Sequence, residues 1–159
     1  MNRSVESILR FVHLTSSGLL AGSLGFGGAA LFPGWEEELP LERRNEAART
    51  LKAFNAIGPT ALASSVALLV AGRRGGAFRR ILDAGAAASL AGALGATLLG
   101  TVPANRKISL DAPRDYASDD QINTTKLWSR AHALRTTLGV SAFVMAVGAS
   151  VLAARKSNT

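Results

Sequence analysis

Four long apolar segments alternate with polar loops along the chain. The segments cover about residues 14–32, 53–72, 81–102 and 128–154. A helix needs about 20 mostly apolar residues to cross the roughly 30 Å hydrocarbon core of a bilayer, and each segment is close to that length. Beyond two arginines at the start of the fourth segment, Asp83 is the only charged residue inside them. The pattern therefore predicts four membrane-spanning helices.

Small residues recur at helical spacing inside these segments and indicate how the helices pack. In lipid, helices associate through close approach of their backbones, which Gly, Ala and Ser permit. We expect one all-α domain over residues 1–159, an integral membrane antiparallel four-helix bundle, with its tightest contacts at Gly22, Gly92 and Ala146. Pro59 is expected to kink the second helix, and Pro103 is expected to end the third.

Composition and charge narrow the classes of partner. Charged residues make up 18% of the chain, compared with roughly 25% in soluble proteins. The net charge of +7 would suggest nucleic acid in a soluble protein, but here the basic residues lie between the apolar segments. Anionic lipid headgroups attract such residues, so we expect membrane lipid and no nucleic acid. The chain has no cysteine, which excludes disulfides, thiolate catalysis and cysteine-ligated metal.

The distribution of arginine predicts the orientation in the cell membrane. The short loop over residues 73–80 carries four arginines and no acidic residue. Arginine and lysine accumulate in cytoplasmic loops. We therefore expect this loop and both termini to be cytoplasmic, and the two longer loops to face outward.

The start of the fourth segment carries the best candidate site. Trp128, His132 and Arg135 are separated by four and three residues, which places them on one face of a helix. A charge at membrane depth is costly and marks a functional candidate. Asn105 and Asn55 are expected at the same membrane level. Two interpretations remain open: a shared ligand site, or an interfacial tryptophan anchor with an arginine that ties loops together.

The other histidine, His13, shares a stripe with Arg10 and Ser17 near the inner end of the first helix. With both termini inside, His13 and His132 are expected roughly 15 Å apart along the membrane normal, too far to ligate one haem. We expect His13 to be a solvated interfacial residue. The sequence shows no metal-ligand spacing and no phosphate-binding loop, so it predicts no metal and no cofactor.

The second half of the chain resembles a known family. TVPANRK (residues 101–107) and LWSRAHALRTTLG (residues 127–139) are similar to the C-terminal signature of the anthrone-oxygenase-like family. Its members are small four-span membrane proteins, and in bacteria they are largely a domain of unknown function. The residues that match the signature are Pro103, Asn105, Trp128, His132 and Arg135.

The resemblance implies an oxygenase that converts a tricyclic anthrone into an anthraquinone without a cofactor. In this reaction the anthrone loses a carbon-bound proton, and the resulting enolate reacts with oxygen. The resemblance suggests His132 as the base. Arg135 and Asn105 would stabilise the enolate oxygen, and Trp128 and Asn55 would contact the lipophilic aromatic substrate.

A non-catalytic role is the alternative. Small size, few aromatic residues and glycine ridges suit a membrane subunit that binds lipid, forms a homo-oligomer or stabilises a larger membrane complex. An enclosed pocket around the polar stripe would favour the enzyme. Tight ion pairs filling that space would favour the structural subunit.

Overall fold

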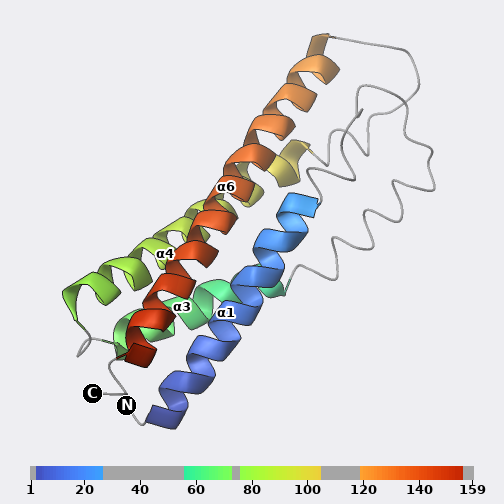
Figure 1. Cartoon of the computed structure of the whole chain (residues 1–159). Helices are drawn as coiled ribbons and strands as arrows, with labels where there is room; N and C mark the ends of the chain where they lie inside the picture. Colours follow the sequence, from blue (N-terminus) through green and yellow to red (C-terminus); the bar gives the residue numbers. More distant parts are fainter. Residues whose placement is uncertain (1–2, 27–55, 73–75, 105–118, 156–159) are drawn as a thin grey trace.

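The computed structural model describes residues 3–26, 56–72, 76–104 and 119–155, and the regular structure in these residues is entirely helical. The elements in chain order are α1 (Arg3–Phe26), α3 (Ile57–Ala71), α4 (Ala77–Ala96), the π-helical segment η2 (Thr97–Thr101) and α6 (Asp119–Arg155) (Figure 1). The all-α fold class predicted from the sequence is confirmed for this part of the chain.

The helices run in alternating directions and lie alongside one another. The longest, α6, has 37 residues and packs against α4, η2 and α1, while α3 packs against α1 and α4. The start of α1, the end of α3, the start of α4 and the end of α6 lie at one end of the molecule (Figure 1). We call this the terminal end. The start of α6 and the end of α1 lie toward the opposite end.

Small side chains form the centre of the bundle. Ala61 on α3, Leu90 on α4 and Ala142 on α6 are almost fully buried and pack together, with Leu20 and Leu62 partly buried against them. Alanine at such positions lets helix backbones approach closely. The core is therefore narrow, and close helix contacts decide its geometry.

Close contacts form at two of the three positions predicted from the small-residue ridges. Ala146 is 1% exposed, and a Cβ atom added at Gly92 would lie 3.0 Å from a leucine of α6. The prediction for Gly22 is wrong for the described helices, because a Cβ atom there would meet none of their atoms within 4 Å. Gly18 faces α6 instead, and its added Cβ atom would lie 3.1 Å from Phe143. The spacing alone does not say which stripe of small residues meets a partner helix.

Replacing Gly100 by alanine should destabilise the protein. The new Cβ atom would lie 2.6 Å from Cβ of Ala131 on α6, and neither side chain can rotate away. Overpacking of this kind costs about 1–3 kcal/mol. Gly22→Ala is the control, because it adds a methyl group at an exposed position and should raise helix stability by up to about 1 kcal/mol. Thermal melting in detergent compares the two; equal melting temperatures would contradict the close contact between η2 and α6.

The two prolines disturb the helices less than the sequence suggested. Pro59 lies in the first turn of α3, which begins at Ile57. Since first-turn N–H groups have no intrahelical acceptor, the expected kink does not arise. The third helix continues through Pro103 to Ala104, so Pro103 does not end it. The wider π turn of η2 just before Pro103 makes room for a ring that would clash with a preceding α-helical turn.

Within the described residues, two helical stretches are long and apolar enough to cross a membrane, judged by length and composition: Ala77–Ala104 and Lys126–Arg155. They cover the third and fourth predicted spans completely. The shorter apolar helix α3 has 15 residues. The parts of the first and second predicted spans at 27–32 and 53–55 lie outside the described residues.

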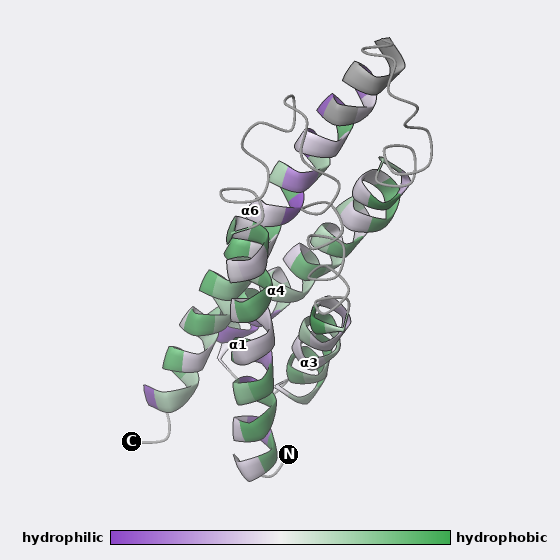
Figure 2. Ribbon diagram, turned by 90° about the vertical axis from the view of Figure 1, so that its right-hand side faces the viewer, coloured by the Kyte–Doolittle hydropathy of each residue, from purple (hydrophilic) through white to green (hydrophobic). Residues whose placement is uncertain are grey.

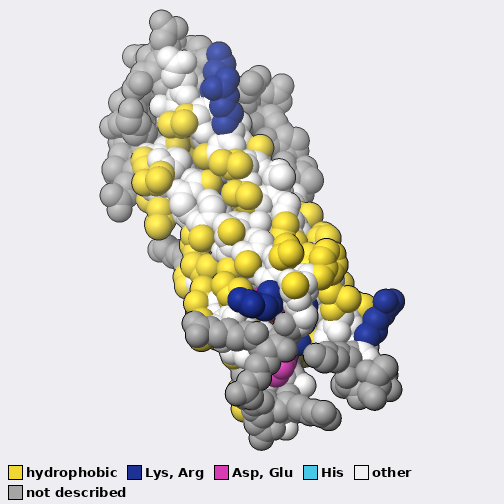
Figure 3. All heavy atoms as spheres, turned by 90° about the vertical axis from the view of Figure 1, so that its left-hand side faces the viewer, with side chains coloured by type: hydrophobic (Ala, Val, Ile, Leu, Met, Phe, Trp, Pro, Cys, Tyr) yellow, Lys and Arg dark blue, Asp and Glu magenta, His cyan; other side chains and the backbone are white. Residues whose placement is uncertain are grey.

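Large apolar side chains cover the outer faces of these helices. Leu99 is 83% exposed, Phe11 70% and Ile81 64%. Figure 2 shows hydrophobic residues along the helices, and Figure 3 shows them spread over one face of the molecule. A largely apolar groove between α1 and α3 belongs to the same exterior. Apolar surface of this extent is typical of contact with a membrane or another protein.

Candidate functional site

Trp128, His132 and Arg135 form one buried stripe on α6, on the face that their spacing predicted. Their exposed fractions are 4%, 7% and 6%. Burial of an arginine is costly unless its charge is compensated by a partner. The contacts that these three side chains make therefore decide what the stripe can do.

The three side chains contact one another directly. The rings of Trp128 and His132 are stacked, with centroids 5.0 Å apart and planes inclined by 4°. Arg135 directs two guanidinium nitrogens at the Nδ1 atom of His132, with Nε at 3.0 Å and Nη2 at 2.8 Å. The tryptophan thus holds one face of the imidazole, and the arginine holds one of its two ring nitrogens.

The contact with Arg135 sets the protonation of the His132 ring. Arginine has only N–H donors and does not lose its charge in proteins. The Nδ1 atom that faces it must therefore be the acceptor, without a hydrogen. A neutral ring then carries its hydrogen on Nε2.

The π-helical segment η2 packs next to this stripe. Gly100 in η2 approaches Ala131, the residue just before His132, and Thr101 is 1% exposed. Single π turns inside α-helices are frequent at functional sites. On α6 itself, Thr136 lies one turn beyond His132, and its Oγ1 atom is buried without a hydrogen-bond partner in the described part of the chain. The stripe of Trp128, His132 and Arg135 thus has the hydroxyl groups of Thr101 and Thr136 nearby, although most side chains of these helices are apolar.

The structure brings together three of the five site residues proposed from the sequence. Trp128, His132 and Arg135 are in contact, whereas Asn105 and Asn55 lie outside the described residues. The catalytic and binding roles assigned to all five remain predictions.

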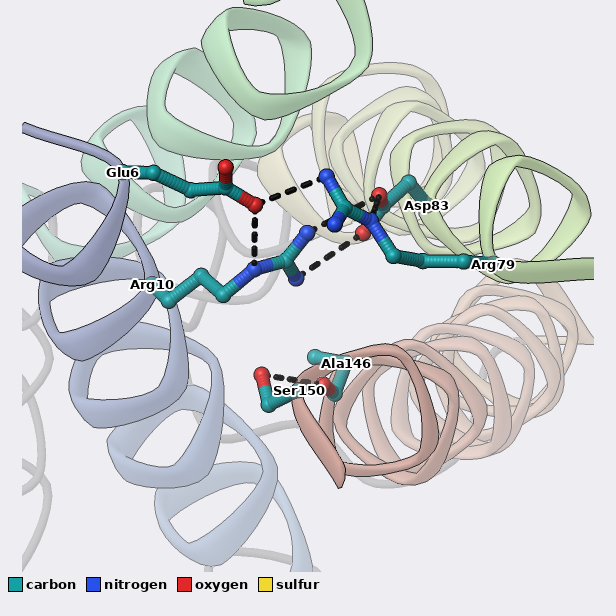
Figure 4. Close-up of polar contacts among 6 residues, drawn as sticks. All are labelled: Glu6, Arg10, Arg79, Asp83, Ala146 and Ser150. Atoms are coloured by element: carbon teal, nitrogen blue, oxygen red, sulfur yellow. Dashed lines mark hydrogen bonds and ion pairs between the residues drawn. The ribbon is translucent and has the colours of Figure 1, made fainter. Parts of the chain in front are cut away.

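A second buried polar cluster lies toward the terminal end and was not predicted as a unit. Arg10 on α1 donates from Nη1 and Nη2 to the two carboxylate oxygens of Asp83 on α4, each at 3.3 Å (Figure 4). Arg79 on α4 pairs with Glu6 on α1 at 2.7 Å, and Glu6 also accepts from Nε of Arg10 at 3.2 Å. We call these four residues the charge cluster. It contains two positive and two negative side chains, so it is neutral overall.

His13 belongs to the same region and is not solvated, so that prediction is wrong. It is 1% exposed, and its Nδ1 atom lies 3.4 Å from Oγ of Ser64 on α3. The backbone of Leu24 on α1 interacts with His132, so Leu24 marks the level of His132 along α1. His13 lies eleven residues before Leu24, or roughly 16 Å at 1.5 Å per residue. The two histidines therefore lie at different levels, as the sequence predicted, and they do not share one ligand.

Asp83 is the sequence signal that could have pointed to the charge cluster. As the only acidic residue inside the apolar segments, it needs a positive partner at the same depth. Its partner Arg10 lies on α1, and a pairing between two helices distant in sequence cannot be obtained from periodicity.

The comparisons with known proteins agree with the motif of the second half. Residues 47–145, more than half of the chain, match the family model described as anthrone oxygenase. The match contains the stripe of Trp128, His132 and Arg135 and ends before the last turns of α6; it excludes α1. No curated protein and no solved structure matches the chain.

Proposed function

Because the chain belongs to the anthrone oxygenase family, we propose that it is a membrane-embedded oxygenase that converts a tricyclic anthrone into an anthraquinone. The observation that carries the proposal is the buried contact between His132 and Arg135, 2.8–3.0 Å apart, inside the residues that match the family. This contact pairs a proton acceptor with a fixed positive charge in a setting shielded from water.

The reaction needs an acceptor for a carbon-bound proton and a positive group for a developing oxyanion. The methylene group of the anthrone loses a proton to His132, and the C–H electron pair moves into an enolate. Its oxygen is stabilised by Arg135, with Asn105 as a second donor. The enolate gives one electron to dioxygen, and the two radicals combine into a peroxide at the former methylene carbon. The peroxide anion takes the proton back from His132, and loss of water from the resulting hydroperoxide forms the second carbonyl group, so anthrone and O₂ give anthraquinone and water.

The substrate class is a flat lipophilic ketone that reaches the site from the membrane. Trp128 and Asn55 are the proposed substrate contacts. Since one face of Trp128 is stacked on His132, we assign it the edge and the opposite face for contact with the aromatic rings. An anthrone dissolves in the hydrocarbon that the exposed side chains of the helices face.

We also propose that the protein is a four-span bundle in the cell membrane with both termini cytoplasmic. The support is the two long apolar helices, the apolar exterior and the arginines of residues 73–80. A phosphatase reporter, active only outside the cytoplasm, should be inactive when fused after Thr159 and active when inserted between residues 105 and 118. Activity of the C-terminal fusion would reverse the orientation.

A non-catalytic membrane subunit is the second candidate, because the charge cluster is a closed set of ion pairs of the kind that supports structure. The two roles differ in whether a substrate is consumed. The purified protein in lipid vesicles should consume O₂ with added anthrone, produce anthraquinone and incorporate one atom of labelled O₂ into the new carbonyl group. Vesicles without protein measure the spontaneous oxidation of anthrone. A rate equal to that background would favour the structural role.

A further inference from the structure

Arg135 differs from Arg10 and Arg79 in having no carboxylate partner among the described residues. Arg10 and Arg79 each pair with Asp83 or Glu6, whereas in the described helices no ion pair includes Arg135, which is 6% exposed. A buried cation without a counter-charge is a large cost to the folded protein. A site that retains such a cation is suited to bind an anion.

The orientation of the Arg135 side chain supports the same conclusion. The edge formed by Nε and Nη2 matches the two oxygens of a carboxylate or phosphate in ordinary pairs. Here both nitrogens converge on one lone pair, that of Nδ1 in His132, at 3.0 and 2.8 Å. One ring nitrogen is a weak acceptor for this edge, and an oxyanion is a much stronger one. The contact with His132 is therefore one that a bound anion displaces.

The same contact blocks the atom that must act as the base. With Nδ1 accepting from Arg135 and the hydrogen on Nε2, the ring has no lone pair available for a substrate proton. His132 gains that capacity only when Arg135 moves away. The stacked ring of Trp128 keeps the imidazole plane fixed during the movement.

We propose that Arg135 exchanges acceptors during turnover, releasing Nδ1 of His132 and binding the enolate oxygen of the substrate. This inference rests on the proposed function and adds its order of events. The carbonyl oxygen of the anthrone approaches Arg135, and the guanidinium turns from Nδ1 toward it. The methylene C–H bond then breaks, its proton binds Nδ1, and its electron pair becomes the enolate. The charge before and after is +1 for the arginine, the ring and the substrate taken together.

The exchange makes the base available only when a carbonyl compound occupies the site. In the empty site Arg135 covers Nδ1 of His132, so that neither water nor another proton donor reaches this atom. Thr136 lies one turn beyond His132 on the same face. Its Oγ1 atom is buried without a hydrogen-bond partner in the described helices, so it can donate to a second substrate oxygen. The ligand class is thus a flat ketone that can form an enolate, rather than any aromatic molecule.

Nitrogen NMR on the two histidines of the intact protein tests the exchange. With labelled histidine in lipid nanodiscs, His132 should show a protonated Nε2 and an unprotonated Nδ1 in the resting state. Anthrone added without oxygen should give the absorption of the enolate and protonate both ring nitrogens. The probe 10,10-dimethylanthrone has the same carbonyl group but no removable hydrogen, so it should leave Nδ1 unprotonated.

Variants of Arg135 separate its charge from its shape. Arg135→Lys retains the charge and loses the planar pair of donors, and Arg135→Gln loses the charge. Each should decrease anaerobic enolate formation by roughly 10²-fold, the size expected for losing an oxyanion donor, and each should allow hydrogen on Nδ1 at rest. Arg130→Gln is the matched control on the same helix, because Arg130 is exposed, and it should change neither signal.

The outcomes separate this inference from the proposed function. Two results would contradict the exchange while leaving the proposed oxygenase activity intact, provided that the wild-type protein makes anthraquinone. One is a hydrogen on Nδ1 in the resting state, and the other is an unprotonated Nδ1 in the anaerobic complex with anthrone. If Arg135→Lys forms the enolate as well as wild type while melting normally, the exchange is also wrong. If the wild-type protein forms neither enolate nor anthraquinone, the proposed function fails, and the exchange fails with it.

Discussion

Replacing Asp83 by alanine should lower the free energy of unfolding by about 3–5 kcal/mol, because Arg10 and Arg79 are then left to share Glu6 as their one carboxylate partner among the described residues. Asp83 is 3% exposed and accepts from both terminal nitrogens of Arg10. Arg10 is itself 7% exposed, so water does not replace the lost carboxylate. Thermal and denaturant unfolding in detergent measure the change.

Two further variants test whether the effect comes from the pair. Glu6→Ala removes a carboxylate whose side chain is 27% exposed and should cost less than about 1 kcal/mol, as partly exposed ion pairs do. The double variant Asp83→Leu with Arg10→Met replaces the pair by apolar side chains and should recover most of the loss. A double variant no more stable than Asp83→Ala would mean that the carboxylate matters for some contact other than Arg10.

The periodic features of the molecule could be predicted from the sequence because they depend on one helix at a time. The stripe of Trp128, His132 and Arg135 follows from the 3.6-residue period of α6. The helical content of the described residues follows in the same way. The contact between Arg135 and His132 is also local, since the two residues are three positions apart.

The features that the sequence predicted wrongly or missed depend on which helices meet. Gly22 and Gly18 are equivalent in a small-residue ridge, and only packing on α6 selects Gly18. The sequence predicts an interfacial His13, but in the structure α3 places Ser64 against its ring. The pair of Arg10 and Asp83 joins residues 73 positions apart, which no local pattern reports. Cross-helix contacts of this kind are set by the tertiary packing as a whole.

Replacing His132 by alanine should reduce anthrone oxidation by roughly 10²–10⁴-fold, the contribution of a general base. In the proposed reaction His132 is the group that takes the methylene proton, and no other imidazole lies at its level of the bundle. The rate is measured as anthraquinone formed per protein in vesicles, after the spontaneous rate is subtracted. Anthrone deuterated at the methylene group should react more slowly with the wild-type protein if proton transfer limits the rate.

The control variants distinguish a lost base from a lost fold. His132→Gln retains a polar side chain of similar length that cannot accept the proton, so it should be as inactive as His132→Ala. Imidazole added to His132→Ala should restore part of the rate, because the ring fits the space left between Trp128 and Arg135. Arg130→Gln should remain fully active. If His132→Ala melts like wild type and oxidises anthrone at a similar rate, His132 is not the base. In that case the contact between His132 and Arg135 no longer supports the proposed reaction, and family membership alone does not locate the chemistry.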